Sequence, residues 1–301
     1  MANPDSGLER AGTFPLGDRR VHRIGYGAMQ LAGDGVFGPP HDRDEALRVL
    51  RAAVAAGIDH IDTAQYYGPG TVNELIREAL HPYPDNLVIV SKVGARRGSD
   101  GSILLFDEPD ELTMGIEENL ETLGVDRLGA VNLRLLDGAV PGKRFDAQLA
   151  AMIRAREAGL IEGIGLSNIS RQHLLRALDQ TPIVCVQNLF NVVERGSSDL
   201  LAECAAHNVA FVPFCPLGMS REARRRIRTD PQSVSIAKRL NATPAQVALA
   251  WLLDLSPNIL LIPGTKNSTH LAENIDSGTV ALDDADRRSF FVRVAAGPEI
   301  I

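Results

Sequence analysis

The chain has 301 residues and a formal net charge of -7, with 45% hydrophobic and 23% charged side chains. This length allows one large α/β barrel or two ordinary domains, and the composition is typical of a globular protein. The acidic surplus argues against general nucleic-acid binding, and no apolar run approaches the roughly 20 residues that cross a bilayer. The first residues lack an export signal, and the three cysteines lack metal-ligand spacing. We therefore expect a cytoplasmic protein with no metal site, no nucleic-acid partner and no membrane partner.

Short β-rich apolar runs alternate with amphipathic helical stretches along most of the chain. The runs that predict strands are 24–27, 58–62, 87–92, 128–134, 161–167, 183–187, 210–214 and 259–263. The helices between them carry start and stop signals. Asp42, with Glu45 three residues later, resembles a capping box. Ser170 and Thr243 predict further helix N-termini, and Gly124 predicts a helix end.

Strands that alternate with helices pair in parallel through right-handed crossovers. Eight such units predict an α/β fold, a closed (β/α)8 TIM barrel with its site at the C-terminal ends of the strands. The alternative is an open doubly wound sheet, which would place Gly-x-Gly-x-x-Gly between the first strand and a helix. The stretch there reads IGYGAMQLAGDG, and its glycines do not open a helix. We therefore favour the barrel, with an N-terminal β-hairpin around Gly17 and Asp18 that covers its bottom.

Polar residues at the strand ends then become informative. The second strand ends on Asp62, Tyr67 follows in the next loop, and the third strand ends on Lys92. A buried lysine needs a carboxylate partner, and Asp62 is the nearest by topology. An ammonium beside a phenol lowers the phenol pKa, and such a phenol can protonate a carbonyl oxygen. Spacing alone equally allows a structural ion pair with a tyrosine at the rim.

Six motifs in chain order resemble those of the aldo-keto reductase superfamily: IDTAQYYG, IVSK, GIGLSN, VQN, VPFCPLG and LLIPGTK. More narrowly, GYGAMQLAGDGVFGPP, GARRG, VNLR, IVCVQN and ALAWLLDLSPNILLIPGT are similar to the bacterial pyridoxal reductase (pyridoxine 4-dehydrogenase) subgroup. The resemblance covers nearly the whole chain. It implies one barrel domain over 1–301, in which we expect 1–11 to be a flexible tail, acting as a monomer or weak homo-oligomer.

The resemblance implies NADPH-dependent reduction of an aldehyde to an alcohol, in this subgroup pyridoxal to pyridoxine, with the reverse oxidation also open. Other aldehydes are the alternative substrates. The superfamily's catalytic tyrosine, lysine and aspartate match Tyr67, Lys92 and Asp62. The matches at the nicotinamide end of the cofactor are Ser167, Asn168, Gln187 and Phe214. The matches at its adenosine end are Thr265, Lys266, His270, Glu273 and Asn274. Many members have arginine where His270 stands, which leaves NADH open as the cofactor.

One catalytic position departs from the superfamily pattern. Its fourth catalytic residue is usually a histidine after the fourth strand, and here VNLRLLD places Arg134 there. A fixed cation would depress the Tyr67 pKa and hold an oxyanion such as the ionised 3-hydroxyl of pyridoxal. The alternative is that Arg134 has only a structural role and holds neighbouring loops in place through an ion pair with Asp137. The replacement also leaves open a low-turnover cofactor-binding sensor or scaffold, and Lys92 leaves open a Schiff-base aldolase.

Overall fold

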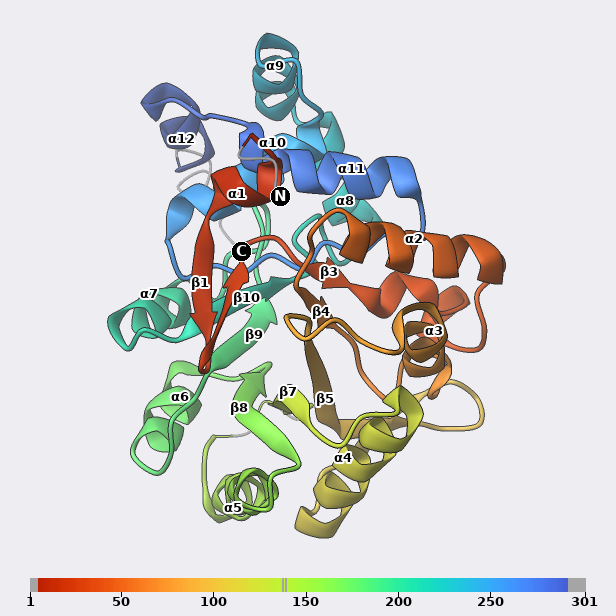
Figure 1. The fold of residues 1–301 in the computed structure, drawn as a ribbon. Helices are drawn as coiled ribbons and strands as arrows, with labels where there is room; N and C mark the ends of the chain where they lie inside the picture. Colours follow the sequence, from red (N-terminus) through yellow and green to blue (C-terminus); the bar gives the residue numbers. More distant parts are fainter. Residues whose placement is uncertain (1–4, 137, 139, 292–301) are drawn as a thin grey trace.

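A computed structural model, which describes residues 5–136, 138 and 140–291, shows the expected (β/α)8 barrel (Figure 1). Parallel strands pair in the order β10-β9-β8-β7-β5-β4-β3. Their bounds are β3 (Tyr26–Gly27), β4 (His60–Asp62), β5 (Val88–Arg97), β7 (Leu128–Arg134), β8 (Ile161–Ser167), β9 (Cys185–Leu189) and β10 (Ala210–Phe214). The chain order and parallel pairing confirm the fold predicted from the alternation of strands and helices.

The eighth predicted strand, 259–263, closes the barrel with less pairing than expected. It forms only two isolated parallel bridges, Phe211 with Ile259 on one side and Ile24 with Leu261 on the other. Single hydrogen bonds such as Leu261 N to Arg23 O, at 2.8 Å, support these bridges. The segment is short because Pro263 has no N–H to continue the ladder. The barrel is therefore closed, but its seam has fewer paired residues than any other strand junction in it.

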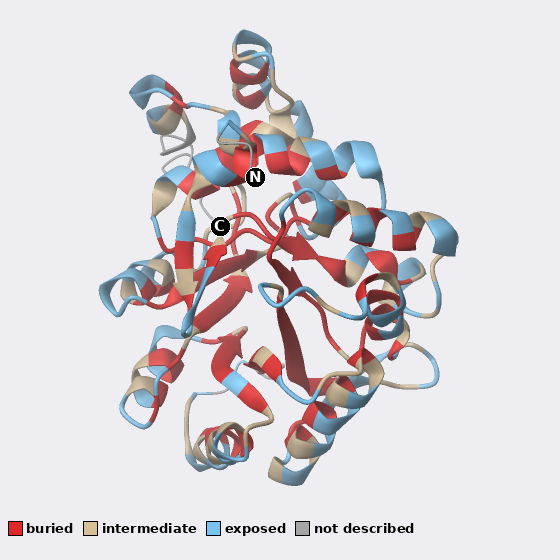
Figure 2. Ribbon diagram, in the orientation of Figure 1, coloured by how far each residue is buried: buried red, intermediate tan, exposed pale blue. Residues whose placement is uncertain are grey.

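Helices surround the barrel and cover its outer face. They are α1 (Gly7–Ala11), α2 (Arg43–Ala55), α3 (Thr71–Leu80), α4 (Pro109–Leu123), α5 (Lys143–Glu157), α6 (Arg171–Leu178), α7 (Ser198–Ala206), α8 (Arg221–Thr229), α9 (Pro231–Arg239), α10 (Pro244–Leu255), α11 (Ser268–Asp276) and α12 (Asp284–Phe291). Short 3-10 turns are η1 (Ala28–Leu31), η2 (Asp34–Val36) and η3 (Ser277–Thr279). In Figure 2 the strands of the barrel are almost entirely buried, whereas the helices are exposed on their outer sides. Within the described residues, no helix has both the length and the apolar character needed to cross a membrane.

The predicted helix signals are mostly confirmed. Asp42 caps α2 by accepting from the Glu45 backbone N–H at 2.8 Å, but the Glu45 side chain binds Arg48 and Ser268 instead of closing a capping box. Thr243 does form a complete box with Gln246 at the start of α10. Gly124 ends α4 with φ at 67°, a left-handed conformation that glycine adopts without steric cost.

The N-terminal hairpin seals the bottom of the barrel as expected. Its strands are β1 (Thr13–Leu16) and β2 (Arg19–His22), paired antiparallel. Phe14, Leu16 and Val21 join a buried cluster with side chains that line the inside of the barrel, among them Val88 and Val212. The hairpin therefore covers the bottom of the barrel with an apolar cluster.

Two segments differ from expectation. The sequence predicts a flexible tail over 1–11, but residues 7–11 form α1. Ser6 caps the first turn of this helix, and Leu8 is buried in the main core. Residues 1–4 lie outside the described part of the chain. The third strand was expected to end at Lys92, yet β5 runs on to Arg97. There it pairs antiparallel with β6 (Ile103–Phe106). This β5–β6 hairpin rises from the barrel at the end where the site lies.

Candidate active site

The centre of the predicted site is a buried ion pair between neighbouring strands. Lys92 Nζ donates to Asp62 Oδ1 at 2.5 Å and to the Thr63 carbonyl at 2.9 Å. The two side chains are 2% and 4% exposed, so water does not screen their attraction. A buried ammonium needs such a partner, and the pairing predicted from topology is confirmed.

The second oxygen of Asp62 is held from across the barrel. Gln187 Nε2 donates to Asp62 Oδ2 at 2.7 Å. The other amide atom of this side chain, Gln187 Oε1, is buried and has no hydrogen-bond partner among the residues that the structure describes. A buried acceptor of this kind is satisfied by a hydrogen-bond donor from outside the chain, either a water or a ligand N–H. The primary amide of a nicotinamide ring would supply one, so this atom fits the expected cofactor.

Tyr67 lies beside the ion pair, as the sequence predicted. The Lys92 ammonium is 5.1 Å from the centroid of its ring, and Tyr66 packs edge-on against the same ring at 5.3 Å. Tyr67 is 7% exposed. The three predicted catalytic residues therefore come together at the upper end of the barrel.

The expected direction of the Tyr67 pKa is wrong. Burial raises it far above the ordinary value and Asp62 raises it further, while Arg134 and Arg97 lower it. The charge of Lys92 is largely compensated by Asp62, because their atoms are 2.5 Å apart. The predicted effect of Arg134 on this phenol has the right sign but is outweighed by desolvation.

Arg134 ends β7 and reaches across the same end of the barrel. One of its Nη atoms donates to Ser167 Oγ at 3.1 Å, and its guanidinium carbon lies 5.2 Å from the Phe214 ring centroid. The alternative partner Asp137 lies outside the described residues. Arg134 is thus in contact with two residues that the resemblance assigned to the nicotinamide end of the cofactor.

Those nicotinamide-end residues gather on adjacent strands. Ser167 of β8 pairs in register with Gln187 of β9. Asn168 follows with φ at 58°, in the left-handed region, and its Nδ2 donates to the Leu135 carbonyl at 2.7 Å. Phe214 ends β10, half-buried. Of the four matches, Gln187 contacts Asp62 directly, Asn168 N donates to the Gln187 carbonyl at 3.0 Å, and Arg134 contacts Ser167 and Phe214.

The adenosine-end residues lie in α11 and just before it. They are distant in sequence from Asp62 and Lys92 and do not lie on the strands that carry this ion pair. Thr265 accepts from the Asn267 backbone N–H at 3.1 Å, and Asn267 caps the helix. Lys266 and His270 are exposed here. One turn on, Glu273 is half-buried and Asn274 buried. Two basic side chains at a helix N-terminus suit an anionic group.

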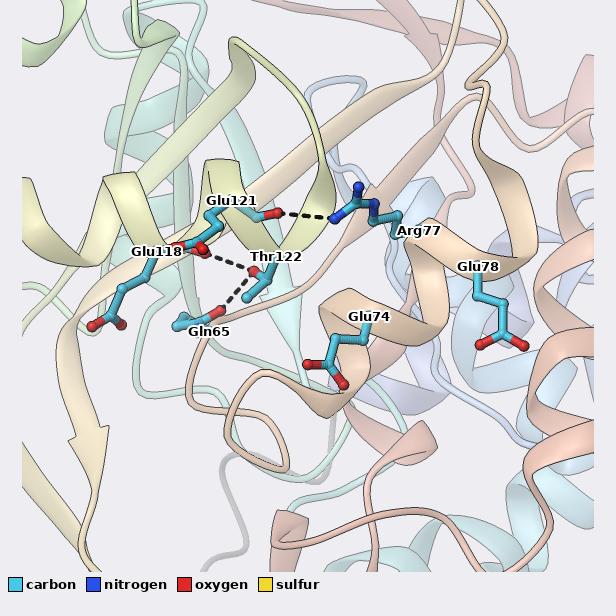
Figure 3. A pocket seen from close by; sticks show the side chains of 7 residues that line it. All are labelled: Gln65, Glu74, Arg77, Glu78, Glu118, Glu121 and Thr122. Carbon is cyan, nitrogen blue, oxygen red and sulfur yellow. Dashed lines mark hydrogen bonds between the residues drawn. The ribbon is translucent and has the colours of Figure 1, made fainter.

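A separate groove lies between α3 and α4 (Figure 3), with a volume of about 510 Å³. The side chains that line it are Gln65, Glu74, Arg77, Glu78, Glu118, Glu121 and Thr122. Its polar groups bind one another: Thr122 donates to Gln65 at 3.0 Å, and Arg77 donates to the Glu121 carbonyl at 3.4 Å. None of the predicted site residues lines it. Across the described chain, no group of three or more His, Cys, Asp or Glu side chains is placed to hold a metal ion.

Sequence reasoning missed several contacts of this site. It did not foresee the bond from Gln187 to Asp62, because these residues are 125 positions apart. It gave no role to Arg97, whose partners are backbone carbonyls. The run VSKVGARR does not alternate between apolar and polar residues, so its pattern does not extend β5 to Arg97.

Known proteins resemble this chain over nearly its whole length. The aldo/keto reductase family model matches residues 23–290. A pyridoxine 4-dehydrogenase of Escherichia coli (strain K12) is 47% identical over 275 residues, which cover 90% of this chain and 94% of that protein. A thermostable aldo-keto reductase solved with the inhibitor epalrestat superposes with a TM-score of 0.77 at 30% identity, covering 92% of this chain and 98% of the other. An aldo-keto reductase of Klebsiella pneumoniae in complex with NADPH has a TM-score of 0.79 at 23% identity, covering 95% and 96%.

Proposed function

Because this chain belongs to the aldo/keto reductase family, we propose that it reduces an aldehyde to an alcohol with NADPH. We further propose that its substrate is pyridoxal, reduced to pyridoxine, and that the reverse oxidation also occurs. The observation that carries the proposal is the buried Lys92–Asp62 pair beside the Tyr67 ring. The 47% identity to a pyridoxine 4-dehydrogenase supports the choice of substrate.

In this proposal Tyr67 is the acid. Its hydroxyl donates a proton to the carbonyl oxygen as negative charge develops there. The high pKa of the phenol keeps it protonated and able to donate. Lys92, held by Asp62, and Arg134 place positive charge near that oxygen, where it stabilises the developing alkoxide. The bound cofactor supplies the hydride.

The same residues explain how the nicotinamide end would be held. Gln187 Oε1 would accept from the carboxamide, and Ser167 and Asn168 would complete its polar contacts. Phe214 offers a ring for stacking. At the adenosine end, Lys266 and His270 would bind the 2′-phosphate, and Thr265, Glu273 and Asn274 would contact the adenosine.

Arg134 favours a more specific substrate choice. Its guanidinium can pair with an ionised hydroxyl next to the aldehyde, which pyridoxal has and benzaldehyde lacks. The same replacement of histidine also favours a second candidate function, a cofactor-binding sensor or scaffold with little turnover. The complete Asp62, Tyr67 and Lys92 set argues against that candidate, and the nicotinamide-end residues argue against a Schiff-base aldolase.

The test follows NADPH absorbance with pyridoxal and with a small panel of other aldehydes, and repeats each assay with NADH. Preferential oxidation of NADPH by pyridoxal supports the proposal. Preference for another aldehyde keeps the reductase and rejects the substrate. Tight NADPH binding without oxidation by any aldehyde would support the sensor. Cytoplasmic location and a monomeric or weakly oligomeric state stay predictions.

A further inference from the structure

Arg97, at the end of β5, binds the backbone of three separate loops. Its Nε donates to the Tyr66 carbonyl at 3.3 Å, and its two terminal nitrogens donate to the Gly101 carbonyl at 2.7 Å and the Gly35 carbonyl at 3.2 Å. Only a guanidinium presents several donors in one rigid plane. A lysine at this position could not serve all three acceptors.

The two peptide groups that flank Tyr67 are both fixed by this arrangement. The carbonyl before it, on Tyr66, accepts from Arg97. The N–H after it, on Gly68, donates to the Val36 carbonyl at 3.2 Å. Because Gly35 also accepts from Arg97, the loop over 33–38 and the loop that carries Tyr67 are joined on both sides of the catalytic residue.

The loop over 33–38 is strained where it is held. Val36 has a φ of 62°, a left-handed conformation that is a genuine outlier for a β-branched residue. Such a conformation persists only where surrounding contacts impose it. The contacts on either side are the Arg97 bond to Gly35 and the Gly68 bond to Val36.

We propose that Arg97 is a positioning residue, which holds the strained 33–38 loop against the loop of Tyr67 and so fixes the phenol for proton transfer. This inference rests on the proposed function for its catalytic consequence only. The Arg97 charge also lowers the Tyr67 pKa, against the stronger effect of burial.

Paired variants separate geometry from charge. Arg97→Lys keeps the charge and loses the three-way contact, and we expect the kcat of aldehyde reduction to fall about tenfold or more, since small misplacements of a catalytic group are costly. The KM for NADPH should stay unchanged. Arg97→Gln also removes the charge, so the half-maximal pH of alcohol oxidation, in which Tyr67 acts as phenolate, should move upward. Arg96→Lys is the matched control, because Arg96 is the adjacent exposed arginine and lies over the Phe106 ring at 5.0 Å.

Hydrogen exchange tests the contact without any activity. In Arg97→Lys the amides over 33–38 and the Gly68 amide should exchange faster than in the wild type or in Arg96→Lys. Val36→Gly relieves the strain, so the double variant Arg97→Lys with Val36→Gly should recover part of the lost kcat. Unchanged exchange in Arg97→Lys would overturn the proposal, as would an equal loss of kcat in Arg96→Lys. A wild-type protein that reduces no aldehyde would reject the proposed function, while the exchange comparison would still decide the role of Arg97.

Discussion

Gln187 and Asp62 are joined by a hydrogen bond of 2.7 Å across the barrel, and the other amide atom of Gln187 is buried with no partner among the residues that the structure describes. One side chain thus orients the carboxylate of the ion pair and offers an acceptor to a cofactor. Structural and binding roles of Gln187 are therefore coupled, and they can be separated only by comparison with a similar pair elsewhere in the chain.

Gln187→Leu should weaken NADPH binding and lower stability. The change removes a buried bond to a carboxylate, which costs about 1–3 kcal/mol of unfolding free energy. Gln148→Leu is the matched control, because Gln148 Nε2 donates to the buried Asp107 Oδ2 at the same 2.7 Å. We expect urea unfolding to show similar losses for both variants. Fluorescence titration should show weaker NADPH binding for Gln187→Leu alone, and equal affinities would reject the cofactor role.

Tyr67→Phe should retain cofactor binding and lose most turnover. Loss of a general acid lowers kcat by about 10²–10⁴-fold. Tyr66→Phe provides the control, since Tyr66 is the adjacent buried phenol and its hydroxyl has no partner within the described chain. That variant should keep both turnover and stability, because no hydrogen bond is lost. Steady-state assays with pyridoxal check both, and substantial turnover by Tyr67→Phe would exclude Tyr67 as the proton donor.

Arg134→His should impair pyridoxal reduction more than benzaldehyde reduction. The expected difference is about tenfold in kcat/KM, the value of a charge-assisted hydrogen bond to the ring oxyanion. The comparison of the two aldehydes within each variant controls for any change in the position of Ser167 or Phe214. Equal losses on both substrates would leave Arg134 a general stabiliser of negative charge.

The pair of His22 and Asp59 at the bottom of the barrel should make stability depend on pH. His22 Nδ1 lies 2.8 Å from Asp59 Oδ2. The hydrogen bond that the Asp59 carboxylate accepts from the His22 ring raises the pKa of His22 above 6.5. Burial alone would raise the pKa of Asp59, but its bonds to His22 and His60 outweigh it and bring that pKa well below 3.8.

The raised pKa of His22 and the lowered pKa of Asp59 define the pH range over which this pair stabilises the fold. The His22 contribution is complete below its unfolded pKa near 6.5 and is lost as pH rises through its higher folded value. The Asp59 contribution is complete above its unfolded pKa near 3.8 and is lost as pH falls through its lower folded value. His22→Gln should therefore cost more unfolding free energy at pH 5 than at pH 9, measured by urea unfolding. His207→Gln, at an exposed pair with Glu203, should cost little at either pH.

The fold could be predicted because local signals agreed with the global arrangement. The spacing of strands and caps such as Thr243 follows from short-range preferences. The trio of Asp62, Tyr67 and Lys92 could be predicted because strand ends meet at one end of a barrel. These signals lie within a few residues of each position that they specify.

The parts that could not be predicted depend on the backbone and on burial. Arg97 binds carbonyls of residues far apart in sequence, and every residue carries a carbonyl, so no side-chain pattern marks its partners. The continuation of β5 from Lys92 to Arg97 could not be predicted, because GARRG is typical of a turn. The Tyr67 pKa was predicted with the wrong sign because spacing gives charges but does not give desolvation.

The N-terminal hairpin makes the two openings of the barrel chemically unequal. Phe14, Leu16 and Val21 cover the lower opening with apolar side chains. The Lys92 ammonium above them therefore has a region of low dielectric constant on one side. We therefore expect solutes and protons to reach Tyr67 from the opposite end of the barrel. Removal of the first 22 residues would let water enter the barrel from the bottom. That water would weaken the charge interactions in the barrel interior.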